Sequence, residues 1–290
     1  MADNIKQHYV PQTLLNNFFE NKSIVFVLDK SNNSIFGSNK RDIAEENNFY
    51  SISNDLETKN EWDNYYKTII EPLLGKVIRE ITYICDSEND VFDSNLKNDI
   101  AISMFHQALR GKHTRELTKA TYEKESFGLL ASVKEIFPKY YQLAENNLKD
   151  EYFFKSILMG CCIDEIDNNP IFKEFKKRNY LIYEIIGGSE FLICDDPIVF
   201  YDGRNFNIEK FGGGLANPNT HVLFPITKKL AIVSTHRKTE KFRNKRIFYL
   251  DCTITREKEK IEIFNYMIYK YAKQYVYSNS KQKLEYYIGK

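Results

Sequence analysis

The residues best suited to chemistry in this 290-residue chain lie in three separate stretches. The first is "QHYVPQTLLNNF", in which His8 and Gln12 flank Pro11 at the predicted start of a helix. An imidazole can act as a general acid or base near neutral pH, and a helix N-terminus attracts anions. His8 and Gln12 are therefore candidate catalytic residues. The structural alternative is a hydrophobic staple at the helix start, with Gln12 satisfying a backbone group.

The second stretch is "MFHQALRGKHTREL", which has helical character. On a continuous helix, His106, Arg110 and His113 would share one face. Arg110 and Arg115 carry forked donors that suit phosphate or carboxylate, so both are candidates for binding an anionic substrate. Gly111 weakens the helix between them. The structural alternative is a solvated basic face paired with nearby acidic residues.

The third stretch is "FLICDDPIVFY", in which an apolar strand ends in Asp195 and Asp196. Extended residues alternate sides, so one of the two carboxylates is expected to face a given cleft. The proline that follows holds Asp196 in an extended conformation. A carboxylate at a strand end can serve as a general base or a magnesium ligand. An Asx turn between two strands is the structural alternative.

The elements that position these residues change in character along the chain. Residues 1–55 predict a small β unit that carries the opening stretch, and residues 56–168 show apolar residues at helical spacing. Residues 169–290 are rich in short β patterns and end in a predicted helix that includes "YVYS". Segregated helices and strands favour an α+β fold, here a single domain spanning residues 1–290.

Composition narrows the classes of protein to consider. The 41 basic and 40 acidic residues nearly cancel, which disfavours a general affinity for nucleic acid or for anionic membranes. Five cysteines without a C-x-x-C pair predict reduced thiols and a cytoplasmic protein. No apolar run reaches the roughly 18 residues that a membrane helix needs. Walker, G-x-S-x-G and H-E-x-x-H motifs are absent from the sequence.

Several stretches together resemble one family. "HYVPQTLLNNF" resembles the opening signature H-Y-x-P-x-x-x-L-x-x-F of the microbial DUF4238 proteins, a domain of unknown function. "FLICDDPIVFY" is similar to the family's S-D-N-P-V block, with Cys194 for Ser and Asp196 for Asn, and "HQALRGKHTRE" is loosely similar to its central helix. The resemblance covers nearly the whole chain. It implies that His8, Arg110 and Asp195 belong to one recurring layout, and it supplies no reaction.

One hypothesis is an enzyme acting on a phosphate-containing substrate, a nuclease or phosphoesterase in a bacterial setting of phage defence or mobile elements. His8 would be the general acid or base, Arg110 and Arg115 would bind phosphate, and Asp195 would be a base or metal ligand. The expected substrate is a nucleotide or a structured RNA.

The cofactor of such an enzyme stays open. A divalent metal such as Mg²⁺ would suit the carboxylates, and Glu57 or Glu61 could complete its shell.

The second hypothesis is a non-catalytic sensing or protein-interaction module. In that case His8, Arg110 and Asp195 would form a buried polar network that fixes the N-terminal segment onto the helices. The 20 Tyr and 21 Phe residues suit a protein partner surface as well as a core. The oligomeric state is not encoded in any pattern that we recognise.

Overall fold

The structure is a computed structural model that describes residues 5–19, 22–51, 60–87, 92–150, 155–156, 160, 166–208, 214–239 and 246–290. Its helices are α1 (Gln12–Phe19), α2 (Glu61–Tyr65), a π-helical turn (Tyr66–Ile70), α3 (Glu71–Asp86), α4 (Ser94–Leu109), α5 (Lys112–Ile136), α6 (Tyr141–Lys149), α8 (Pro170–Lys176), α9 (Thr255–Tyr271) and α10 (Lys281–Glu285), with short 3-10 turns at Pro138–Tyr140 and Ile166–Asn168. Its strands are β1 (Lys6–His8), β2 (Ile24–Asp29), β3 (Ser34–Asn39), β4 (Glu45–Asn47), β5 (Asn179–Ile186), β6 (Ile193–Cys194), β7 (Val199–Asp202), β8 (Thr220–Pro225), β9 (Leu230–Thr235), β10 (Ile247–Asp251) and β11 (Tyr275–Ser278).

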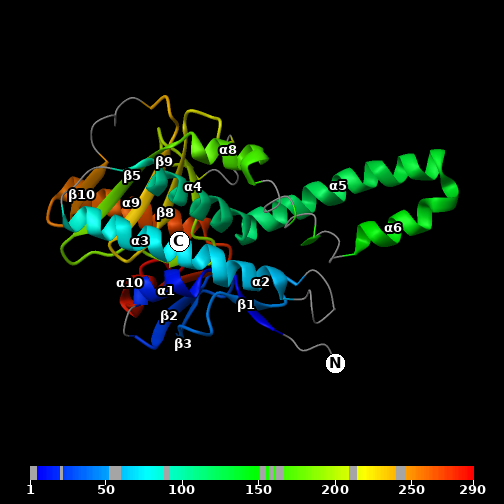
Figure 1. Ribbon diagram of the computed structural model, residues 1–290. Coiled ribbons are helices and arrows are strands. Elements are labelled where there is room, and N and C mark those ends of the chain that lie inside the picture. The colour runs from blue at the N-terminus through cyan, green and yellow to red at the C-terminus, as the bar shows by residue number, and fades with distance from the viewer. Residues whose placement is uncertain are drawn as a thin grey trace.

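The fold is α+β, as the sequence predicts (Figure 1). The largest sheet has the order β10-β5-β9-β8-β7 and comes entirely from the β-rich C-terminal portion. β10 runs parallel to β5, whereas the other neighbours are antiparallel. Helix α9 packs on this sheet, where the Phe264 ring lies 5.4 Å from the Tyr183 ring. Ile261, Phe264, Ile268 and Tyr271 recur at helical spacing and are buried.

A second sheet joins the two ends of the chain, in the order β3-β2-β11-β6. β11 is antiparallel to both neighbours, so that Val276 pairs with Leu28 on one side and with Cys194 on the other. The prediction that the terminal helix includes "YVYS" is therefore wrong, because α9 ends at Tyr271. Aromatic and β-branched residues are favoured in strands. The edges of β2 and β6 supply the backbone hydrogen bonds that these residues would otherwise make within a helix.

The helical region contains a break that matters for the candidate site. α4 ends at Leu109 and α5 begins at Lys112, so the chain turns at Arg110 and Gly111. The expectation that His106, Arg110 and His113 share one helix face is wrong for this reason. Asp93 caps α4, since its carboxylate accepts from the N–H of Leu96 at 2.7 Å.

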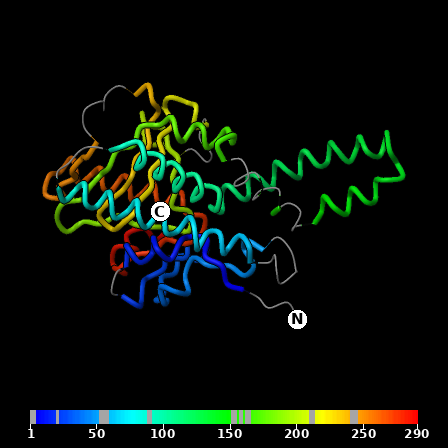
Figure 2. Tube along the Cα trace, in the orientation of Figure 1, coloured from blue at the N-terminus to red at the C-terminus, as the bar shows by residue number. Residues whose placement is uncertain are grey.

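Helices α5 and α6 form a hairpin that projects away from both sheets, as the ribbon and the tube show (Figures 1 and 2). Large apolar side chains are exposed along it, among them Phe127, Ile136, Phe137 and Leu143. The rest of the helical region packs into a buried cluster that also contains residues of both sheets. At the base of the hairpin His113 is buried, whereas the far end is exposed.

None of the helices in the described ranges is both long and apolar enough to cross a membrane. Cys85, Cys194 and Cys252 are reduced thiols rather than halves of a disulfide. Cys161 and Cys162 lie outside the described residues.

Candidate functional site

The His8 imidazole lies at the end of β1 and faces the segment that leads into β4. Its Nε2 is 2.9 Å from the carbonyl oxygen of Arg41, 2.6 Å from the side-chain amide of Gln12 and 3.7 Å from Oε2 of Glu45. The side chain is 19% exposed. The structure thus brings the two candidates of the opening stretch together. Arg110 binds the backbone carbonyl of His8 rather than either of these side chains.

Arg110 is buried at the turn between α4 and α5, with 3% of its surface exposed. Its Nε donates to the Tyr50 hydroxyl at 2.7 Å, and its Nη2 donates to the His8 carbonyl. The Tyr50 hydroxyl donates to the same carbonyl at 3.0 Å. The guanidinium also stacks over the Tyr66 ring, 4.5 Å from its centroid, and lies 3.6 Å from Oε1 of Glu71. Arg110 consequently holds the end of the N-terminal strand β1 against the helices.

Further polar contacts hold the same strand from both sides. The amide of Gln107 donates to the Tyr9 carbonyl at 3.2 Å, and Gln7 Oε1 accepts from the Tyr50 N–H at 2.6 Å. In an isolated edge strand, such polar groups would form hydrogen bonds with water. Here they bind residues that lie far away in the sequence, so β1 is fixed on the helical core.

Asp195 is fully buried and binds the backbone that follows α9. Its Oδ1 accepts from the N–H of Lys273 at 2.9 Å, and its Oδ2 accepts from the N–H groups of Gln274 at 2.7 Å and Tyr275 at 3.0 Å. Burial raises the pKa of Asp195, and the backbone donors, led by Tyr275, oppose that rise. These bonds turn the chain from α9 into β11.

Asp196 points to a different element, as alternation along an extended chain predicts. Its Oδ2 accepts from the His113 N–H at 2.9 Å, in the first turn of α5. A Cβ added to Gly111 would lie 2.4 Å from Oδ1, so only a glycine allows the backbone to approach the carboxyl group this closely. Burial raises the pKa of Asp196 well above its ordinary value. Asp196 thus caps α5 from outside the helix through a long-range contact, and this role differs both from a catalytic carboxylate and from the alternative of an Asx turn.

Arg115 lies one turn into α5 and holds the end of the N-terminal unit. Its Nη2 donates to the Phe49 carbonyl, and its guanidinium lies 3.8 Å from the centroid of the Phe49 ring. Lys112 Nζ lies 4.4 Å from the centroid of the Tyr9 ring. Arg115 and Arg110 therefore have the same structural role, because both bind backbone carbonyls of the N-terminal unit.

The histidines of the central stretch have separate environments. His113 Nε2 lies 2.5 Å from the Tyr271 carbonyl at the end of α9. His106 is fully buried against the rings of Tyr65, Tyr66 and Phe105. Burial, aided by Arg110, lowers the pKa of His106 to about 3, so the imidazole is neutral near pH 7.

The metal hypothesis finds no cluster to build on in the described ranges, which contain no group of three His, Cys, Asp or Glu side chains that could hold an ion. Glu57 lies outside those ranges, and Glu61 is exposed at the start of α2. The oxygens of Asp195 and Asp196 already accept from backbone N–H groups of different elements.

A separate pocket is lined by Lys260, Tyr183 and Thr235. No sequence pattern singled out these residues, although Arg256 and Lys260 at i and i+4 are a usable signal.

Taken as a class, this is an α+β protein in which three distant sequence blocks meet at the α4–α5 turn, where Arg110 binds the N-terminal strand and Asp196 caps α5. The sequence profile of the family described as "Protein of unknown function (DUF4238)" matches residues 6–282, nearly the whole chain. The chain therefore belongs to the DUF4238 family, and the predicted resemblance is confirmed. Comparisons with curated proteins and with solved structures gave no match.

Proposed function

We propose that this chain is a non-catalytic, cytoplasmic sensing or protein-interaction module, in which the backbone carbonyl of His8 and the side chains of Arg110, Asp195 and Asp196 form an internal polar network. One observation carries the proposal. Arg110, Asp195 and Asp196 are at most 3% exposed and are bound to backbone groups of distant segments. Buried charged groups in proteins are paired, and such networks specify a unique arrangement of elements.

The network acts on the base of the projecting hairpin. Asp196 caps the first turn of α5, and Arg110 occupies the residue before its N-cap. Fixing these backbone groups fixes the direction in which α5 leaves the core. This supports a role in presenting the α5–α6 hairpin at a defined angle.

The hairpin surface favours a protein partner over nucleic acid. Between residues 119 and 150, which leaves out the first two turns of α5, the sequence carries five basic and five acidic residues, so this projecting part of the hairpin has no net charge. Phe127 is 77% exposed and Ile136 is 64% exposed. A neutral surface with exposed aromatic and aliphatic side chains fits a partner whose contact surface is also apolar and weakly charged.

An enzyme acting on a phosphate-containing substrate, such as a nuclease or phosphoesterase in microbial defence, is the alternative proposal. It requires a phosphate to reach Arg110, or a water molecule to reach Asp195. Both side chains are sealed by protein groups in this structure. We therefore rank this alternative second.

The deciding experiment combines a hydrolysis screen with equilibrium unfolding. Wild type, Arg110→Met and Asp195→Asn are assayed against RNA, DNA and mononucleotides with Mg²⁺ and Mn²⁺. We expect no hydrolysis that depends on either residue, and a lower free energy of unfolding in both variants. Hydrolysis by the wild type that both variants lose, at an unchanged free energy of unfolding, would establish the enzyme instead.

A further inference from the structure

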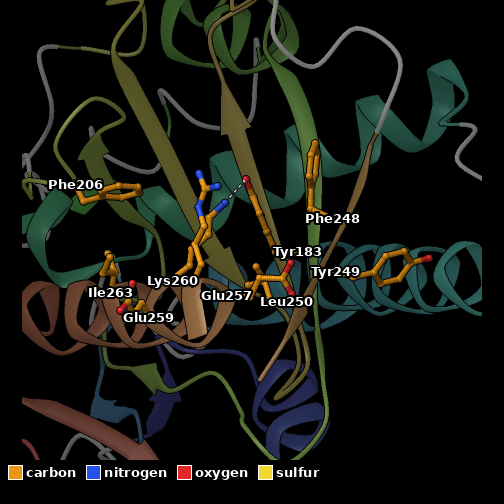
Figure 3. Close-up of a pocket in the computed structure, with 10 residues that line it drawn as sticks. Tyr183, Phe206, Phe248, Tyr249, Leu250, Glu257, Glu259, Lys260 and Ile263 are labelled. Carbon is orange, nitrogen blue, oxygen red and sulfur yellow. Dashed lines mark hydrogen bonds between the residues drawn. The ribbon is translucent and has the colours of Figure 1, made fainter. Parts of the chain in front are cut away.

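A basin of about 440 Å³ lies between the first turns of α9 and the strands β5 and β10. Figure 3 shows Lys260 rising from α9, with Tyr183 and Phe248 on one side and Phe206 on the other. The Tyr183 and Phe248 rings are stacked, with centroids 5.4 Å apart. The volume falls in the range of roughly 300–1,000 Å³ that small-molecule sites occupy.

The basin continues into a smaller recess of about 130 Å³, because Tyr183, Phe206 and Lys260 line both. Aromatic rings form much of the recess wall. The Tyr201 and Phe206 rings are stacked at 6.0 Å, and Phe264 closes another side. An engineered apolar cavity of about 150 Å³ binds benzene, so this recess suits a single six-membered ring.

The recess also contains two polar side chains, Thr235 and His221. Thr235 is 1% exposed, and its hydroxyl has no hydrogen-bond partner in the described part of the chain. A buried hydroxyl without a partner costs free energy, which a bound ligand would recover. The His221 imidazole lines the same recess, and burial lowers its pKa to about 4. It is therefore neutral near pH 7 and offers one donor and one acceptor.

The His221 ring has a defined place because of Gly203. A Cβ at Gly203 would lie 2.3 Å from Cε1 of His221, so the ring packs directly over the glycine backbone. The Tyr201 ring meets the His221 ring edge to face at 5.4 Å. The polar side of the recess is thus built by packing, and it does not depend on a free side chain finding its position.

Positive charge gathers where the recess meets the basin. Arg256 and Lys260 are one turn apart on α9, in its N-terminal part, where the helix dipole also favours an anion. Lys260 Nζ donates to the Tyr183 hydroxyl at 3.0 Å and lies 4.1 Å from the centroid of that ring. Burial, and then Arg256, lower the pKa of Lys260 to about 8. An anion between the two cations would relieve their repulsion.

Two carboxylates also line the basin, and they limit where an anion can sit. Glu257 is engaged, because its Oε2 accepts from the Asp251 N–H at 2.5 Å. Glu259 is exposed on α9. The place for an anion is therefore between Arg256 and Lys260, on the side of the Tyr183 ring.

We propose that this pocket binds a pyrimidine nucleoside monophosphate, with the base in the recess at Thr235 and His221 and the phosphate at Arg256 and Lys260. The ring size, the unpartnered hydroxyl and the pair of cations together specify this class of ligand. The proposal deepens the sensing role proposed above and rests on it only for its biological meaning. It uses none of the network residues, so either proposal can fail alone.

The test is calorimetric titration of the full chain with UMP, CMP, AMP, GMP, uridine and inorganic phosphate. We expect UMP or CMP to bind at least several-fold more tightly than the purine nucleotides, uridine or phosphate. Lys260→Met keeps the apolar stem and removes the charge, and should weaken binding at least ten-fold. Thr235→Val keeps the shape and removes the hydroxyl, and should weaken binding of UMP and uridine by a similar several-fold factor.

Lys258→Met is the matched control, because Lys258 is exposed on the same helix and does not line the pocket. It should bind like wild type. Unfolding curves verify that each variant is folded, and Lys260→Met should be no less stable than wild type since it removes a partly desolvated charge. The proposal is overturned if no pyrimidine nucleotide binds, if purine nucleotides or inorganic phosphate bind equally well, or if folded Lys260→Met binds like wild type.

Discussion

Arg110 and Tyr50 bind the same backbone oxygen, that of His8, and they also bind each other through a 2.7 Å hydrogen bond from Arg110 Nε to the Tyr50 hydroxyl. Three segments of the chain therefore share one buried polar centre. The His8 imidazole takes no part in it. This arrangement separates the role of the main chain at residue 8 from the role of its side chain, and it makes their effects distinguishable by mutation.

Arg110→Met should lower the free energy of unfolding by about 3 kcal/mol, because it removes one of the two donors to the His8 carbonyl, the donor to the Tyr50 hydroxyl and the cation beside Glu71. Urea denaturation measures this change. Arg115→Met is the matched control, since Arg115 is half-buried at the surface, and it should cost clearly less. Equal costs for the two variants would contradict the central position of Arg110.

His8→Ala should cost only about 1 kcal/mol, because the imidazole is partly exposed and its polar contacts are to the Arg41 carbonyl, to Gln12 and, at 3.7 Å, to Glu45. The clamp on its carbonyl is a backbone contact and remains. Denaturation curves of His8→Ala and Arg110→Met in one buffer provide the comparison. A cost for His8→Ala as large as that for Arg110→Met would place the imidazole in the network after all.

Asp195→Asn and Asp196→Asn should loosen different parts of the chain. Asp196→Asn weakens the cap on α5, so amide hydrogen exchange should accelerate at residues 112–116. Asp195→Asn weakens the turn into β11, so exchange should accelerate at residues 273–275. Each variant serves as the control for the other, and identical exchange patterns would refute the separate assignments.

The stability of the wild type should fall as the pH drops below 6.5, in part because of His106. Its pKa of about 3 in the folded state lies below the ordinary value of 6.5, so the unfolded chain binds the proton first. One such group contributes a slope of up to about 1.4 kcal/mol per pH unit. Between pH 6.5 and 5, His106→Phe should show a correspondingly shallower slope in urea denaturation. A slope equal to that of wild type would show that His106 is not held neutral.

Local patterns in the sequence were sufficient for several features of this protein. The spacing of apolar residues at helical intervals predicted the helices of the central region, because this spacing is a local property of the chain. The family followed from ordered motifs that cover nearly the whole chain. The break at Gly111 was foreseeable from glycine's low helix propensity.

Tertiary structure alone decided what the polar motif residues contact. Asp196 reaches a helix that begins more than 80 residues earlier, and Asp195 reaches a turn 78–80 residues later. "YVYS" became a strand because β2 and β6 offered it two edges. Hydrogen bonds between distant segments depend on how the elements pack, and the periodicity of apolar residues along the chain does not predict that packing. For this reason the sequence alone determines which residues are polar and roughly where the helices lie. Only the fold determines that Asp195 and Asp196 are buried, and that Lys260 and Thr235 line one pocket.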